Sequence, residues 1–103
     1  AGTLLNKINN MLNKKSYANG QPVFELMDNK LTYFYKNGTI KATGPFINGL
    51  MEGEWTFYRE SGQLWQTANF RNSKKHGSWV RYDKNGRIEY QEEFENNKII
   101  KKK

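Results

Sequence analysis

Hydrophobic and polar residues alternate in short runs along most of the chain, and each run ends in a cluster of turn-forming residues. Residues 55–58 are aromatic and β-branched, residues 60–62 (Glu-Ser-Gly) have turn chemistry, and residues 63–70 form a second extended run. This order predicts a β-hairpin. A second turn follows at residues 70–73 (Phe-Arg-Asn-Ser), so the chain is predicted to run strand, tight turn, strand, tight turn as a β-meander.

The same pattern recurs with a period of 24 residues, which indicates structurally equivalent units. The columns in this register are Gly38, Gly62 and Gly86; Ile40, Leu64 and Ile88; Phe46, Phe70 and Phe94; Asn48, Asn72 and Asn96; Phe34, Tyr58 and Tyr82; Leu31, Trp55 and Trp79; and Gly53 with Gly77. The repeat predicts an all-β fold, an elongated single-layer antiparallel meander of repeated hairpins. We assign Gly38, Gly62, Gly86, Gly53 and Gly77 to structural turns, because a residue without Cβ adopts positive φ at little cost.

The units divide the chain into a repeat sheet and an N-terminal cap. We expect a helix or cap at residues 1–16 and the sheet at 17–103, with a degenerate unit at 17–30, full units at 31–53, 54–77 and 78–100, and a basic tail at 101–103. The first unit is assigned because residues 17–20 (Tyr-Ala-Asn-Gly) echo residues 35–38 (Tyr-Lys-Asn-Gly).

Residues 3–15 differ from the repeats because their apolar residues have helical spacing. Thr3 suits an N-cap, and the polar residues of this segment lie away from its apolar side. The pattern predicts a short amphipathic helix. We expect it to cover one end or face of the sheet, with membrane adsorption and dimerisation as alternatives. Its apolar side consists of Leu4, Leu5, Ile8, Met11 and Leu12.

Composition narrows the class of protein. The chain has 103 residues, 15% of them aromatic, and no cysteine, which predicts one small folded domain without disulfide or thiol chemistry. The mean hydropathy is −0.97, and no apolar run approaches the ~18 residues of a membrane-spanning helix. The chain opens with Ala1-Gly2, so we expect that an upstream segment has been removed; no targeting segment is recognised, and the sequence assigns no compartment.

The positive charge does not form a binding stripe within the repeats. The formal net charge is +7, but residues 31–100 carry ten basic and eight acidic side chains, and three lysines end the chain. This balance does not favour nucleic-acid binding, in which Trp65 and the tyrosines would stack bases beside Arg59, Arg71 and Arg81.

Residues 53–64 (GEWTFYRESGQL) and 77–88 (GSWVRYDKNGRI) resemble the bacterial variant of the MORN repeat, and the resemblance covers residues 31–100. It implies hairpins stacked into an elongated single-layer sheet. It also implies a relation to YwqK-type antitoxins. Other MORN proteins are linked to phospholipids, protein scaffolding or dimer formation. The Tyr-x-Gly opening of the eukaryotic unit is replaced here by Phe-x-Asn.

The inventory of catalytic groups is small, so we expect no enzyme activity, no cofactor and no metal. His76 is the only imidazole and is expected in an exposed turn. The acidic residues Glu89, Glu92, Glu93 and Glu95 are expected to protect a strand edge. The glycines recur at hairpin turns and form no phosphate-binding loop.

The aromatic residues are the better binding candidates. Strand alternation sends Trp55 and Phe57 to one face and Tyr58 to the other. One interpretation of the Trp column is a core that stacks along the repeat axis, whereas Trp65, whose column holds Lys41 and Glu89, is expected to be exposed. The candidate protein-binding residues are Trp65, Trp55, Trp79, Tyr58, Tyr82 and Tyr33.

These features favour a non-catalytic protein-binding or scaffold module with an unidentified protein partner, and the resemblance implies an antitoxin-like role for it. A homodimer through unpaired strand edges is an alternative. A second alternative is a peripheral module for anionic membranes, in which the basic termini contact lipid. Its candidate residues are Lys7, Lys14, Lys15, Lys101, Lys102 and Lys103.

Overall fold

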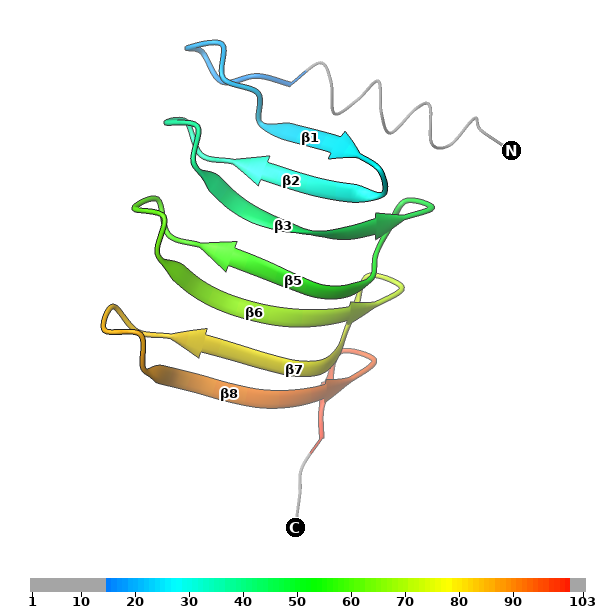
Figure 1. Cartoon of the computed structure of the whole chain (residues 1–103). Helices are drawn as coiled ribbons and strands as arrows, with labels where there is room; N and C mark the ends of the chain where they lie inside the picture. The colour runs from blue at the N-terminus through cyan, green and yellow to red at the C-terminus, as the bar shows by residue number, and fades with distance from the viewer. Residues whose placement is uncertain (1–14, 101–103) are drawn as a thin grey trace.

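The computed structural model describes residues 15–100, which form one open antiparallel β-sheet without a helix (Figure 1). The predicted all-β meander is confirmed. The helix predicted at residues 3–15 lies outside the described residues except for Lys15, which is not helical. The strands are β1 (Phe24–Met27), β2 (Lys30–Phe34), β3 (Ile40–Ile47), β4 (Leu50–Met51), β5 (Gly53–Tyr58), β6 (Leu64–Arg71), β7 (Lys74–Tyr82), β8 (Ile88–Glu95) and β9 (Lys98–Ile99).

The strands follow one another across the sheet in chain order. The spatial order is β1-β2-β3-β5-β6-β7-β8-β9, and the short β4 pairs with β3. Connections alternate between the two sides of the sheet, as Figure 1 shows. The molecule is a thin slab with extents of 46 × 36 × 18 Å, because each hairpin adds two strands to a single layer.

On one side the chain reverses through two-residue turns with positive φ at both positions. Asn48 and Gly49 have φ of 54° and 82°, and Asn96 and Asn97 have 48° and 72°. This is the signature of the type I′ turn, whose twist matches that of the flanking strands. The Asn column of the repeat therefore marks the turns that join one hairpin to the next.

On the other side five-residue turns close each hairpin. In the turn at residues 59–63, the Arg59 amide donates to the Gln63 carbonyl at 2.8 Å, and the Gly62 amide donates to the Arg59 carbonyl at 2.8 Å. Gly62 has a φ of 94°, a conformation that suits glycine. Equivalent bonds close the turns at residues 17–21, 35–39 and 83–87, so the degenerate first unit keeps the hairpin geometry.

Two glycines that we assigned to turns lie in strands. Gly53 begins β5, and Gly77 lies within β7, with φ of 67° and 98°. The positive φ of Gly53 kinks the chain between β4 and β5. In β7 the kink at Gly77 coincides with a shift in the pairing register with β6, between Ala68 and Phe70. Gly53 thus bends the chain between β4 and β5, Gly77 bends β7, and neither reverses the chain.

The core lies on one face of the sheet, in a row that crosses every hairpin. We call this face the aromatic face; its central row is Leu26, Leu31, Gly44, Trp55, Ala68, Trp79 and Glu92. Trp55 is only 1% exposed and donates its indole N–H to the Pro45 carbonyl at 2.9 Å. Its ring lies so close to Gly44 that a Cβ there would be 2.4 Å from ring carbons. Gly44 is therefore needed for space.

Candidate functional site

The face opposite the aromatic face has a central row in which four neighbouring strands each contribute a threonine. Successive cross-strand partners along this row are Glu25, Thr32, Thr43, Thr56, Thr67, Val80 and Gln91. The hydroxyls of Thr32 and Thr43 are 3.0 Å apart and share a hydrogen bond. We call this side the threonine face. The threonine side chains of this row project only a short distance from the sheet, because threonine is short and β-branched.

Beside the threonine row, toward the five-residue turns, lies a stripe of apolar pairs. Each hairpin pairs an aromatic residue with an aliphatic one. The aromatic residue lies two positions along its strand from the threonine row, hence on the same face. Its aliphatic cross-strand partner lies three positions from that row, with one unpaired residue between them, so it keeps to the same face. We call these pairs the turn stripe: Phe34 with Ile40, Tyr58 with Leu64, and Tyr82 with Ile88.

The aliphatic members of the turn stripe are open to solvent. Ile40, Leu64 and Ile88 are 41%, 37% and 57% exposed, while their aromatic partners are half-buried. An open hollow of about 310 Å³ is lined by Ile40 of one hairpin and Tyr58 of the next, so neighbouring pairs share one surface. The stripe is therefore continuous from the first hairpin to the second, and the third hairpin repeats the same apolar pair.

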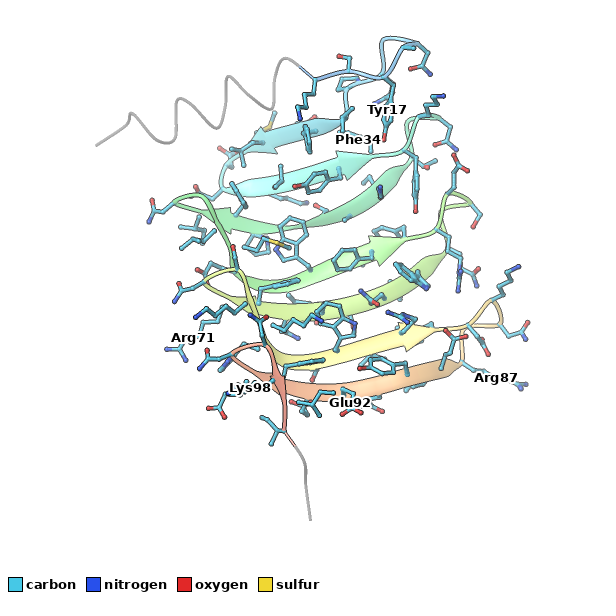
Figure 2. The ribbon with its side chains drawn as sticks, turned by 180° about the vertical axis from the view of Figure 1, so that it is seen from behind. Tyr17, Phe34, Arg71, Arg87, Glu92 and Lys98 are labelled. Carbon is cyan, nitrogen blue, oxygen red and sulfur yellow. The ribbon has the colours of Figure 1, made fainter. Side chains whose placement is uncertain are left out.

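Hydrogen bonds between neighbouring hairpins hold the turn stripe in place. The hydroxyl of Tyr17 donates to the Phe34 carbonyl at 2.7 Å, and the two residues meet at one corner of the sheet (Figure 2). The hydroxyl of Tyr35 donates to the Tyr58 carbonyl at 2.7 Å, and Arg59 Nη2 donates to the Tyr82 carbonyl at 3.0 Å. Each bond runs from the first residue of one turn to the backbone of an aromatic stripe residue in the next hairpin, which fixes the spacing of the pairs.

Three predicted site residues on the aromatic face contribute to packing. Trp55 is buried and has no exposed surface that a partner could contact, so it is not a candidate binding residue. Trp79 and Tyr33 are half-buried. Trp79 stacks edge-on against Phe94 with ring centroids 5.6 Å apart. Burial raises the pKa of the Tyr33 hydroxyl above its ordinary value, because the phenolate would be poorly solvated there.

Trp65 is half-buried, whereas its column suggested exposure. It is the extra residue of a β-bulge, since Tyr58 pairs with Leu64 while Phe57 pairs with Gln66. The Arg81 guanidinium carbon lies 5.1 Å from the Trp65 ring centroid and 5.4 Å from that of Tyr90, and Arg81 Nε donates to Gln66 Oε1 at 3.0 Å. Arg81 therefore covers Trp65 through cation–π contacts on the aromatic face.

The same bulge recurs at Lys41 and Glu89, one in each hairpin. Sequence reasoning missed these bulges. The sequence did contain a signal: the equivalent positions hold Lys41, Trp65 and Glu89, which have unlike side chains. The extra residue of a bulge has no cross-strand partner, so its side chain is not constrained by one.

The basic residues proposed for membrane contact are mostly outside the described part of the chain. Lys15 alone falls within it, with its Nζ 6.0 Å from the Phe24 ring centroid. Other basic residues are divided between the two sides of the sheet: Figure 2 shows Arg71 and Lys98 at one side and Arg87 at the other. Residues 15–100 contain no helix that could cross a membrane.

His76 lies in β7 and is half-buried, so our expectation of an exposed turn residue was wrong. The extended backbone of β7 continues through this position, where the preceding unit has a break between strands. Its Nδ1 is buried without a hydrogen-bond partner. Among residues 15–100, no group of three or more His, Cys, Asp or Glu residues is placed to hold a metal ion.

Sequence reasoning also missed the aliphatic half of the turn stripe. Ile40, Leu64 and Ile88 were recognised as a repeat column but not as surface. The signal was available, because a β-branched or aliphatic residue two positions after each turn glycine lies at a strand end, where a single-layer sheet has little to cover it.

The repeat geometry agrees with a comparison against protein-family models. The model for the MORN repeat variant matches residues 27–48, 51–72 and 75–101. The chain belongs to the MORN repeat variant family. MORN repeats are generally protein-binding or membrane-binding modules. Searches of the curated proteins and of the solved structures returned no match.

Proposed function

We propose that this MORN repeat chain is a non-catalytic protein-binding module and that its partner docks on the turn stripe. The observation that carries the proposal is the periodic exposure of Ile40, Leu64 and Ile88 beside half-buried aromatic residues. Exposed apolar residues repeated along one side of a sheet face are typical of an interaction surface. A scaffold role follows if the partner is held in a fixed orientation along the hairpins.

The pitch of the stripe suggests the form of the partner. Equivalent residues lie two strands apart, which is about 10 Å at ordinary strand spacing. An α-helix repeats its i and i+7 residues at about 10.5 Å. An amphipathic helix that crosses the strands would therefore place one apolar side chain beside each pair, and the bonds from Tyr35 and Arg59 keep that spacing fixed before binding.

The family resemblance suggests a narrower form of the proposal, in which the partner is a toxin protein and the chain acts as its antitoxin. The absence of catalysis is also part of the proposal. It is supported by His76, whose buried Nδ1 contacts no acid or nucleophile by hydrogen bond within residues 15–100. Membrane binding is kept as one outcome of the test below. Of its six candidate lysines, only Lys15 lies within the described residues.

Photo-crosslinking tests the proposal directly. A photoreactive amino acid is placed at position 40 in the turn stripe or, as a matched control, at position 47, because Ile40 and Ile47 are both 41% exposed. Ile47 lies beside a type I′ turn, away from the stripe. We expect one protein to crosslink in source cells at position 40 and not at position 47. Equal crosslinking at both positions, or crosslinks to lipid alone, would overturn the proposal.

A further inference from the structure

The aromatic face carries an apolar cluster that a single layer leaves half-covered. Leu31, Ala42 and Trp55 are buried at its centre. Stable domains bury such a face beneath a second layer, and residues 15–100 provide none. The partly buried hydrophobic residues around the centre are Phe24, Leu26, Tyr33, Phe46, Met51, Phe57 and Phe70.

Charge separates this cluster from the rest of the aromatic face. Over β1, β2, β3 and β5 the paired positions of this face carry no charged side chain, and the bulge residue Lys41 lies at the turn end of β3, with its ammonium 5.7 Å from the Tyr35 ring centroid. Over β7 and β8 the face carries Arg81 and Glu92, and the Lys75 ammonium lies 4.8 Å from the Trp79 ring centroid. An apolar cover therefore fits over the first four of these strands and not over the last two.

The N-terminal segment joins the sheet at the border of the cluster. The Lys15 carbonyl accepts a hydrogen bond from the Val23 amide at 3.2 Å, and the Lys15 ammonium lies over the ring of Phe24. Phe24 pairs with Tyr33, and their rings are 4.7 Å apart on the aromatic face. Residues 1–14 are thus tethered within reach of the cluster, which gives them a high effective concentration there.

The length and pattern of residues 1–14 match the surface they would cover. Fourteen residues form a helix of about 21 Å. Four neighbouring strands span about 14 Å between the axes of the outer two. Leu5, Ile8 and Leu12 fall on one side at helical spacing, with Lys7 and Asn10 away from it.

From this fit we propose that residues 1–14 fold as an amphipathic helix that packs over the aromatic face across β1, β2, β3 and β5, as a second layer. This places the chain's own segment on the aromatic face and leaves the turn stripe, on the opposite face, to a partner. The two proposals concern different faces, so either can fail alone.

A spin label tests the position of the segment in the full chain. Because the chain has no cysteine, Asn10→Cys provides a single attachment point on the polar side of the segment. We expect paramagnetic broadening to remove most of the amide signal intensity of Phe24, Tyr33 and Phe57 and to leave Glu92 nearly unchanged. No selective loss over β1 to β5 would overturn the proposal.

Two controls separate this proposal from the alternatives. A mixture of spin-labelled protein at natural abundance with unlabelled ¹⁵N protein should show no broadening; broadening there would assign the face to a second copy and overturn the intramolecular cover. Ile8→Asp in the labelled protein should restore the lost signals while the β8 signals keep their positions, and Asn13→Asp on the polar side should not. Loss of signal that persists in Ile8→Asp would also contradict the proposal.

Discussion

At the residue scale, the fold depends on close contact between Trp55 and a position that has no side chain. Gly44 has no positive φ, so its role differs from that of the turn glycines. Trp55 lies flat on Gly44, and its other cross-strand partner is the small Ala68. Small residues on both sides let one large ring fill the centre of a sheet that has no opposing layer among the described residues.

Gly44→Ala should destabilise the protein by about 1–3 kcal/mol, because the new methyl group overlaps the Trp55 ring. Urea denaturation gives the free energy of unfolding, and near-ultraviolet circular dichroism reports the displaced indole. Gly20→Ala is the control, since it adds the same methyl in open space at a φ of 89°. It should cost stability through backbone strain but leave the indole signal unchanged. An unaltered indole signal in Gly44→Ala would contradict the packing described.

Tyr33 gives the sheet a predicted dependence on alkaline pH. Burial raises its pKa in the folded state above the ordinary 10.0, so the folded protein holds this proton more tightly than the unfolded chain. The resulting stability is complete below the unfolded pKa and is lost as the pH rises through the folded pKa. The free energy of unfolding should therefore fall more steeply between pH ~9 and pH ~11 in the wild type than in Tyr33→Phe. Identical slopes would show that burial of the Tyr33 hydroxyl does not change the free energy of unfolding in this pH range.

Sequence alone predicted much at this scale, but not which aromatic residues are buried. The alternation of Trp55 and Tyr58 between faces follows from strand geometry and was predicted. The burial of Trp55 depends on Gly44, which is its neighbour across the sheet but eleven positions away in sequence. The half-burial of Trp65 depends on a bulge and on Arg81, and neither follows from the local pattern.

At the element scale, the joint between the first two hairpins combines a short strand ladder with a side-chain hydrogen bond from a turn. β3 and β5 are paired only at Ala42 with Phe57 and at Thr43 with Thr56. The bond from Tyr35 to the Tyr58 carbonyl ties the same two hairpins together at the turn side. Within residues 15–100 no further five-residue turn follows the one at residues 83–87, and Asp83 accepts hydrogen bonds from the amides of Asn85 and Arg87 within its own turn.

Tyr35→Phe should lower the free energy of unfolding by about 1 kcal/mol, because it removes a partly buried bond between hairpins. Tyr58→Phe is the matched control. Among the described side chains the Tyr58 hydroxyl has no hydrogen bond, so that change should stay within about 0.5 kcal/mol. Thermal or urea unfolding of both variants makes the comparison. Equal effects would mean that the bond from Tyr35 adds nothing to the joint between hairpins.

The period predicted the elements well because each unit repeats the same turn chemistry. The Asn column at Asn48, Asn72 and Asn96 marks the type I′ turns, and the Gly column marks the hairpin turns. The strand β9 and the kink at Gly77 were not predicted. Both depend on contacts between neighbouring strands, such as the pairing of Phe94 with Ile99, and not on local propensity.

At the scale of the whole molecule, a single layer exposes two faces with different chemistry. The aromatic face contains the core, and the threonine face carries the turn stripe at its edge. Membership of the MORN repeat variant family is consistent with a molecule whose repeated surface binds a partner. The central claim is that binding energy is concentrated on the turn stripe.

The most direct measurement is the affinity of the purified crosslinked partner for two variants of equal exposure. Leu64 in the stripe and Leu50 outside it are both 37% exposed. We predict that Leu64→Asp weakens binding at least about tenfold, roughly 1.4 kcal/mol, while Leu50→Asp leaves the affinity nearly unchanged. Circular dichroism establishes that both variants remain folded. Equal affinities for Leu64→Asp and the wild type, or an equal loss in both variants, would contradict the turn stripe as the binding surface.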